Sequence, residues 1–448
     1  MKNKMFPAVA ILMAAASLIA GELKFNCAVD KKDAIYKANE KITFTVSLLE
    51  DGKAPEDKFI QYRLYHDHRV VKNGFVSAAK ELKIETSSKN PAWIYVEAWA
   101  KDSKKQPVKQ QVSRKGKLVS EAVRGGIGTM VEPEKLLPPM AEPADFDEFW
   151  NKVKAELAAV PMEELEKVKI EDKRVKNINI FDVKIKCAGE KPVSGYLCVP
   201  KNAQPKSCPA YVSFHGAGVG SSNKPVSVAA KGVIALDINA HGIINGQPPK
   251  FYNDLRNNYY YANNTRYAHW NRDNREKYYF KGMYMRLMRA LEYIKSQPEW
   301  DGKHLIVVGG SQGGAQVIAA CALDKDVTFA RAGVPAMCDH SGCLGNRRSG
   351  WPALYKATKD GKPENQNIAN AAAYFDGAYF AKRIKCPIYI NTGFMDTVCP
   401  PSSVFAAYNS IPSTTEKHMQ TDPFGGHATP HTDGNKALNA YIKSAVKK

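Results

Sequence analysis

The most reactive pattern in the chain surrounds one serine. Residues 309–314 read Gly-Gly-Ser-Gln-Gly-Gly and satisfy Gly-x-Ser-x-Gly, between the apolar run Leu305–Val308 and a helix-period segment, 315–323. A nucleophile on a sharp strand-to-helix turn has strained backbone, and side chains two positions to either side would collide with neighbouring elements. The pattern predicts that Ser311 is a nucleophile held at the end of a strand. The alternative is a tight glycine-rich turn without chemistry.

An acid and a histidine must accompany that serine, because a serine hydroxyl is a poor nucleophile until an oriented histidine removes its proton. In α/β-hydrolases the acid follows the serine in the chain and the histidine comes last. Asp396 follows the apolar run Pro387–Ile390, so we expect it at the carboxyl end of a strand as the orienting acid. Asp422 and Asp433 remain alternatives, each in a loop beside a candidate histidine.

Three histidines lie downstream of Asp396. We favour His427 as the general base because its Gly-Gly lead-in lets the imidazole swing over the serine. His431 is the chief rival. His418 is the third, within a strand-like run where a histidine is more often a packed side chain.

Two backbone N–H groups are candidates for stabilising a developing oxyanion. One belongs to Gln312, at the start of the helix after the serine, where the helix dipole favours negative charge. The other belongs to Ala217, in a His-Gly-Ala-Gly loop directly after the apolar run 211–214. We interpret the side chains of His215 and His241 as structural, with a place for His241 in the pocket wall as the alternative.

These residues need a scaffold, and the second part of the chain alternates β-branched apolar runs with helix-period segments. Such runs are typical of strands buried on both faces, so we expect a doubly wound, mostly parallel α/β sheet. The tyrosine-rich segment 253–279 interrupts the alternation and is expected to be an insertion over the sheet edge or a subunit contact. The runs are 210–214, 233–237, 305–308 and 387–390, with helices at 283–294 and 315–323.

The first part of the chain has a different pattern. From Glu22 to about Ala100, apolar and polar residues alternate in short runs between polar turns, which predicts a small β-sandwich. Residues 101–118 are basic with few large apolar side chains, which predicts a solvated linker. We therefore divide the chain into a signal peptide at 1–20, a β-sandwich-like domain at 21–100, a linker at 101–118 and an α/β domain at 119–448.

Composition narrows the possible partners. The 448 residues carry 64 Lys and Arg against 45 Asp and Glu, a net charge of +19. The excess is spread along the chain, and no zinc-finger or RNA-binding signature accompanies it, so we do not expect nucleic-acid binding. The nine cysteines have no metal-type spacing and form no disulfide framework. We expect no cofactor and no metal, with Cys338 and Cys343 as free thiols; a bridge between them is the alternative.

The first twenty residues are typical of an export signal. Lys2 and Lys4 precede the uncharged apolar stretch Met5–Ala20, which is short for a membrane span and ends among small residues. We expect a periplasmic or extracellular protein with no stable membrane insertion after signal removal. A retained N-terminal anchor is the alternative.

The α/β part resembles the acetyl xylan esterase and cephalosporin C deacetylase family, carbohydrate esterase family seven, from about Val131 to the C-terminus. The resemblance implies an α/β-hydrolase fold with Ser311 as nucleophile, His427 as base, Asp396 as its orienter and the N–H groups of Gln312 and Ala217 as oxyanion hole. It also implies an acetylated oligosaccharide or polysaccharide as substrate, no metal, and a homo-oligomer. The motifs are 142–150, 214–216, 289–292, 310–314 and 396–402.

Some positions depart from the family pattern. Ala217 stands where the family usually has tyrosine, Ala240-His241-Gly242 replaces its Arg-Gly-Gln motif, and Ala428 follows His427 in place of an acid. The N-terminal β-domain is absent from the simplest members. We expect a secreted esterase that removes acetyl groups from xylan or xylo-oligosaccharides through an acyl-enzyme.

Two other functions remain open at this point. One is a prolyl oligopeptidase-type serine peptidase, which shares the order of triad residues, although residues 22–100 lack the repeat length of a propeller. The other is a non-catalytic glycan-binding protein. Trp93 and Trp99 are candidates for stacking on sugars, but their spacing around Tyr95 is more typical of a core face.

Overall fold

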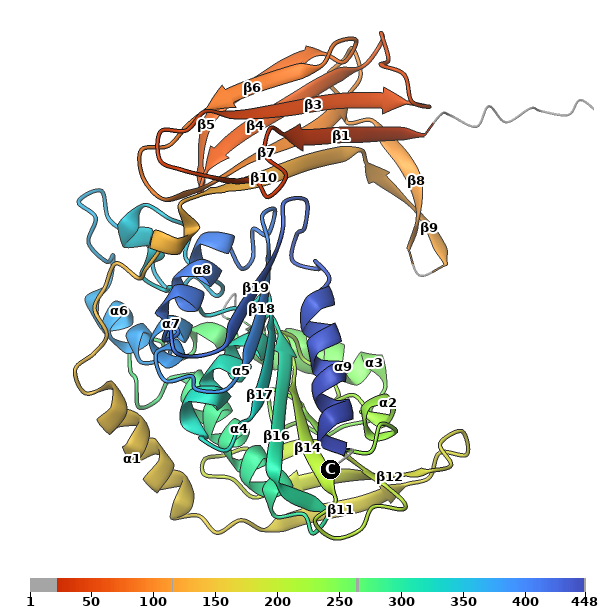
Figure 1. Cartoon of the computed structure of the whole chain (residues 1–448), viewed down its shortest axis with the longest axis vertical. Helices are drawn as coiled ribbons and strands as arrows, with labels where there is room; N and C mark the ends of the chain where they lie inside the picture. The colour runs from red at the N-terminus through yellow and green to blue at the C-terminus, as the bar shows by residue number, and fades with distance from the viewer. Residues whose placement is uncertain (1–21, 115, 263–265, 447–448) are drawn as a thin grey trace, which may run out of the picture.

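The computed structural model describes residues 22–114, 116–262 and 266–446 (Figure 1). The predicted signal peptide, residues 1–20, lies outside these residues. Among the described residues, no helix combines the length and the apolar character that crossing a bilayer requires.

The N-terminal part is a sandwich of two sheets, with strand orders β1-β3-β6 and β2-β10-β7-β4-β5. Alternate side chains of the strands point between the sheets, so Phe44, Ile60 and Val96 share one buried cluster. The strands of the two sheets are β1 (Leu23–Val29), β2 (Ile35–Tyr36), β3 (Ile42–Glu50), β4 (Phe59–His66), β5 (Arg69–Ser77), β6 (Leu82–Thr86), β7 (Ala92–Lys101) and β10 (Arg124–Val131).

Residues 101–118, which we expected to be a solvated linker, contain strands instead. The second half of this segment belongs to a two-stranded hairpin, β8 (Lys109–Arg114) with β9 (Lys117–Ala122), and the chain then returns as β10 to pair with β7 along its length. In a two-stranded hairpin the inward N–H and C=O groups bond across the pair and the outward groups face water, so polar and basic side chains are compatible with these strands. The sandwich therefore continues to Val131.

The C-terminal part contains a nine-stranded sheet in the order β11-β12-β13-β15-β14-β16-β17-β18-β19. Strands β14 to β19 pair in parallel, and β11, β12 and β13 add an antiparallel edge. The predicted mostly parallel sheet is confirmed. Its strands are β11 (Glu164–Ile170), β12 (Ile178–Ile185), β13 (Val193–Pro200), β14 (Cys208–Phe214), β15 (Ile234–Ile238), β16 (Trp300–Gly310), β17 (Phe329–Gly333), β18 (Ile388–Gly393) and β19 (Lys417–Asp422).

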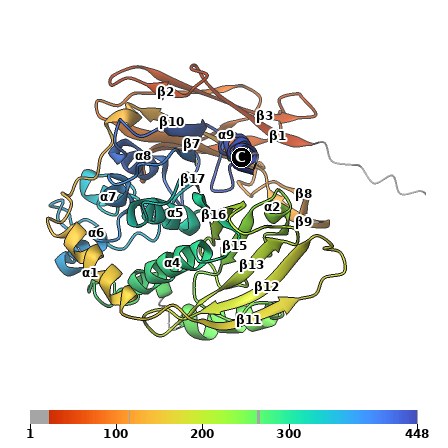
Figure 2. The ribbon, with the colours of Figure 1, turned by 60° about the horizontal axis from the view of Figure 1, so that its bottom comes forward.

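Helices cover both faces of this sheet (Figures 1 and 2). α2 and α9 pack on one face, and the other named α-helices pack around the core of the opposite face. The helices are α1 (Phe146–Ala158), α2 (Val226–Ala229), α3 (Pro249–Leu255), α4 (Tyr279–Lys295), α5 (Gln312–Leu323), α6 (Gln366–Ala373), α7 (Gly377–Ala381), α8 (Pro401–Ser410) and α9 (Thr432–Val446), with short turns at Pro133–Lys135, Arg256–Tyr260, Tyr267–His269 and Gly342–Gly345.

The sandwich lies beside the loops that follow β18 and β19 (Figure 1). Trp93 and Tyr95 of β7 and Met130 of β10 share a buried apolar cluster with Phe394 and Phe405 of the C-terminal part. Burial on both sides of the boundary joins the two parts through a common core.

Candidate active site

Ser311 occupies the turn between β16 and α5 with φ 56° and ψ −123°, a strained conformation for a residue with a side chain. The glycines two positions to either side make the turn possible. A Cβ at Gly309 would lie 2.4 Å from the Gly313 carbonyl oxygen, and one at Gly313 would lie 2.2 Å from the Phe214 carbonyl oxygen. The steric requirement predicted from the pattern is therefore present in the packing.

The structure brings Ser311, His427 and Asp396 into one hydrogen-bonded line. His427 Nε2 lies 3.0 Å from Ser311 Oγ, and His427 Nδ1 lies 2.8 Å from Asp396 Oδ2. Asp396 is fully buried, and its Oδ1 accepts hydrogen bonds from the N–H groups of Val398 and Cys399. Because an ionised carboxylate only accepts, Nδ1 carries the imidazole proton and Nε2 presents its lone pair to the serine hydroxyl.

The rival residues lie elsewhere. His431 is buried and both of its ring nitrogens lack a partner among the described residues; burial and the charge of Arg331 lower its pKa to about 3. His418 contacts Glu416 and stacks on Tyr389. The alternative acids are also engaged or exposed, since Asp422 accepts a hydrogen bond from Thr429 and the Asp433 side chain faces solvent.

The two candidate oxyanion donors belong to segments next to the serine. Gln312 is the first residue of α5, so its N–H has no partner in the preceding turn of helix. The loop of Ala217 runs beside the elbow, and a Cβ built on neighbouring Gly216 would lie 3.8 Å from Ser311 Cβ. The Gln316 side chain ties the two together by donating to the His215 carbonyl at 3.1 Å.

The tyrosine-rich segment 253–279 contacts the Ala217 loop through His241. His241 Nε2 donates to the Gly218 carbonyl at 2.8 Å, and its Nδ1 accepts from the Tyr279 hydroxyl at 2.5 Å. Burial lowers the pKa of His241 to about 3, so the ring is neutral. Tyr267 donates to the Gln312 side chain at 2.6 Å.

His215 has its own partner. Its Nε2 lies 2.6 Å from Asp237 Oδ1, while Ser213 donates to the other oxygen of that carboxylate at 2.5 Å. These bonds hold the start of the loop that contains Ala217 to β15. His215 and His241 thus have the contacts of positioning residues.

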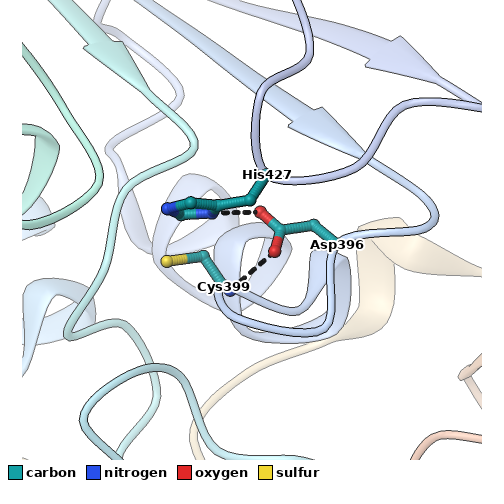
Figure 3. Close-up of side chains that lie close together, drawn as sticks. All are labelled: Asp396, Cys399 and His427. Atoms are coloured by element: carbon teal, nitrogen blue, oxygen red, sulfur yellow. Dashed lines mark hydrogen bonds and ion pairs between the residues drawn. The ribbon is translucent and has the colours of Figure 1, made fainter. Parts of the chain in front are cut away.

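Cys399 is the residue at the site that we did not single out. Its side chain is fully buried beside Asp396 and His427 (Figure 3). Burial raises the pKa of the Cys399 thiol well above its usual value, so the sulfur is protonated and a poor nucleophile. The nine cysteines are all free, Cys338 and Cys343 included.

The N-terminal sandwich contacts both loops that carry the acid and the histidine. Trp93 Nε1 donates to the Phe394 carbonyl at 2.6 Å, two residues before Asp396. The N–H of Gly128 donates to the Pro423 carbonyl at 2.8 Å, four residues before His427. Gly128 permits this approach because a Cβ there would lie 2.1 Å from the Phe394 carbonyl oxygen. Trp93 is fully buried in this contact and is not available for stacking on a sugar.

A mostly parallel sheet with a strained serine after one strand, and an acid and a histidine on later loops, defines an α/β-hydrolase. Two solved structures share the fold. An acetyl xylan esterase from Paenibacillus sp. R4 is 26% identical, with a TM-score of 0.58, and the match covers 70% of this chain and 98% of that one. Acetyl xylan esterase 1 from Thermoanaerobacterium sp. is 22% identical, with the same TM-score and coverage.

The family follows from the sequence comparisons. The acetyl xylan esterase (AXE1) family model matches residues 132–443, from the residue after β10 into α9. The acetyl esterase Axe7A of Xylanibacter ruminicola is 33% identical over 318 residues, which are 70% of either chain. The chain belongs to the acetyl xylan esterase family, and it is a carboxylic ester hydrolase with the acetyl esterase activity of that family.

Proposed function

We propose that this protein is a secreted carbohydrate esterase that removes acetyl groups from xylan or xylo-oligosaccharides through a Ser311-His427-Asp396 triad. The hydrogen-bonded line from Asp396 through His427 to Ser311, with links of 2.8 and 3.0 Å, is the observation that carries the proposal. The substrate class is supported by the family description and by the name of the Paenibacillus relative.

In the acylation step, His427 Nε2 takes the proton of Ser311 Oγ as the oxygen attacks the acetyl carbonyl. The tetrahedral intermediate collapses when the sugar oxygen leaves with the proton that His427 now carries. Water then attacks the acetyl-enzyme with His427 again as base, and acetate is released. Asp396 keeps the ring oriented and stabilises the imidazolium in both steps.

The developing oxyanion needs donors on the side of the carbonyl away from His427. We assign the N–H groups of Gln312 and Ala217 to this role. Backbone donors of this kind are worth about 3–4 kcal/mol of transition-state stabilisation each, because they need no reorganisation during the reaction. The bonds from Gln316 and His241 to the loop around Ala217 support the assignment.

The test is acetate release from acetylated xylo-oligosaccharides, with p-nitrophenyl acetate as a simple ester. We expect turnover of both by the wild type and a loss of about 10⁴-fold or more in kcat for Ser311→Ala. Hydrolysis of p-nitrophenyl acetate alone would leave an esterase with a different substrate. Cleavage of proline peptides without acetate release, or xylan binding without turnover, would replace the proposal with one of the two other functions.

Export and assembly are part of the proposal. Lys2, Lys4 and the apolar stretch Met5–Ala20 support a cleaved signal. N-terminal sequencing of the protein recovered from the periplasm or medium is expected to begin after Ala20 or a nearby small residue. A homo-oligomer is expected from the family resemblance, and sedimentation of the mature protein measures its mass.

A further inference from the structure

Cys399 is a buried thiol beside the proposed catalytic residues, and the proposed hydrolysis does not use it. It follows Asp396 by three residues, in the turn that leads into α8, and its backbone N–H donates to Asp396 Oδ1 at 3.0 Å. The sulfur lies beside the ring of His427, near the ring nitrogen that points away from Asp396 (Figure 3). One donor atom from each of Asp396, Cys399 and His427 lies within 4.8 Å of the others.

This donor set has a definite chemical preference. A thiolate and an imidazole are the ligands of zinc and similar thiophilic cations, whereas magnesium and calcium prefer oxygen ligands throughout. Two ligand atoms of a tetrahedral zinc ion are about 3.5 Å apart, since the bonds are about 2.3 and 2.0 Å long. The sulfur of Cys399 and a ring nitrogen of His427 lie within 4.8 Å of each other, so the two side chains must approach by up to about 1.3 Å to share an ion.

The triad prepares His427 for such a role. Asp396 holds the proton on Nδ1, at 2.8 Å, and leaves the lone pair on Nε2. A carboxylate behind the imidazole is the same outer contact that orients histidine ligands in zinc sites. The side chain of His427 is 34% exposed and Cys399 is fully buried, so a cation has to enter from the side of the imidazole.

We propose that Cys399 Sγ and His427 Nε2 form an inhibitory binding site for a thiophilic divalent cation, of which zinc is the best match. Ser311 Oγ, 3.0 Å from Nε2, is placed to be a third ligand, and water completes the shell. Binding replaces the S–H bond by a sulfur–metal bond and releases one proton to solvent, with no change of oxidation state. The bound ion occupies the lone pair that the base needs, so hydrolysis stops.

The predicted inhibition by zinc rests on the proposed role of His427 as the general base. It is tested by measuring acetate release at increasing zinc concentrations. Each protein is compared with its own rate without metal. We expect zinc to inhibit the wild type, EDTA to restore the rate, and magnesium to have no effect. In Cys399→Ser and Cys399→Val the half-inhibiting zinc concentration should rise at least ten-fold. Equal zinc sensitivity in wild type and both variants, or a wild type that zinc does not inhibit, would overturn the proposal.

The matched control is a pair of thiols elsewhere in the fold that could also bind a thiophilic cation. Cys321 and Cys386 have sulfurs 3.7 Å apart and are the competing thiols among the described residues. Cys386→Ser is expected to keep the zinc sensitivity of the wild type. If Cys386→Ser instead removes the inhibition, the ion acts from that pair and the site at Cys399 is wrong.

Binding is also measured without turnover. Cobalt(II) added to the wild type and to Ser311→Ala should give a thiolate-to-metal charge-transfer band that zinc removes and that Cys399→Val lacks. If the wild type gives the band but does not hydrolyse esters, the metal site is supported and the proposed function is wrong. Ester hydrolysis without the band would remove the metal site alone.

Discussion

The carboxylate of Asp396 divides its oxygens between two tasks. Oδ1 accepts two backbone N–H groups, and Oδ2 faces His427 Nδ1. An asparagine here would turn its oxygen to the backbone donors and its NH₂ to the imidazole. The ring proton would then move to Nε2, and the lone pair that we propose activates Ser311 would be lost.

Asp396→Asn is therefore expected to lower kcat by about 10³–10⁴-fold while the folded structure persists, because shape and backbone bonds are kept. Steady-state kinetics on p-nitrophenyl acetate and a thermal melt measure the two effects. Asp433→Asn is the matched control, because Asp433 is an exposed acid in the helix after the histidine loop. Equal activity of Asp396→Asn and wild type would contradict the assignment of the acid.

At the scale of elements, β7 and β10 of the sandwich hold the ends of β18 and β19. Trp93 is the second residue of β7, and its indole is the buried partner of the Phe394 carbonyl. A buried carbonyl that loses its donor costs about 1–3 kcal/mol. The acid loop then relaxes toward other partners, and Asp396 moves with it.

Trp93→Phe is expected to lower kcat about ten-fold with little change in KM, since Trp93 is fully buried and out of reach of a substrate. Trp99→Phe, a change of the same kind in the same strand, is expected to leave kcat within about two-fold. Trp99 is half-buried with Arg63 above its ring and is not part of the contact with the acid loop. A fall in kcat of the same size for both variants would show a general effect on the sandwich.

Gly128 in β10 gives a second test of the same contact. An alanine Cβ there would meet the Phe394 carbonyl oxygen at 2.1 Å, and the obstacle is backbone, so the loop must shift. Gly128→Ala is expected to lower kcat at least ten-fold and to lower the free energy of unfolding by about 1–3 kcal/mol. Gly282→Ala in α4 is the control, because its Cβ would meet only the end of Arg286 at 3.5 Å. Wild-type kcat in Gly128→Ala would contradict the role of β10.

At the scale of the whole molecule, the junction between the sandwich and the hydrolase part contains a buried acid. Asp67 accepts a hydrogen bond from Ser402 of α8 at 3.1 Å. Burial raises its pKa from 3.8 to about 6, although Ser402 and the charge of Arg347 oppose the shift. The folded state therefore keeps the proton at pH values where the unfolded chain has lost it.

The sign follows from linkage. Below about pH 4, Asp67 is protonated in both the folded and the unfolded state. As pH rises from about 4 through 6, the contribution of Asp67 to the free energy of unfolding falls. Asp67→Asn removes this loss, and asparagine tolerates the left-handed backbone of this position, φ 50°. The variant should exceed the wild type at pH 8 by a few kcal/mol, since one pKa unit is about 1.4 kcal/mol, and match it near pH 4.

Urea unfolding at several pH values between 4 and 8 measures the difference. The comparison between variant and wild type isolates Asp67, because burial also raises the pKa values of Asp339 and Asp376 to about 6 and these acids add their own pH dependence. A stability difference that is constant with pH would show that Asp67 has an ordinary pKa.

The turn that carries Ser311 and the strands that precede Ser311 and Asp396 could be predicted from local sequence patterns. Gly309 and Gly313 around Ser311 identify a turn that side chains would block, and the close contacts at both glycines follow from the same sterics. The apolar runs before Ser311 and Asp396 predicted parallel strands, because strands buried on both faces need apolar residues throughout. These features depend on a few neighbouring residues, so one chain is enough to reveal them.

Contacts between distant segments were decided only in three dimensions. The hairpin in the expected linker forms through pairing of β8 with β9, whose basic and polar sequence does not predict strands, and β10 then pairs with β7. The approach of Trp93 to Phe394 joins residues 301 positions apart. Nothing in the local sequence singles out Cys399, and only the fold brings its sulfur beside Asp396 and His427. Periodicity reports which face of an element is buried, whereas the partner across that face depends on how the whole chain packs.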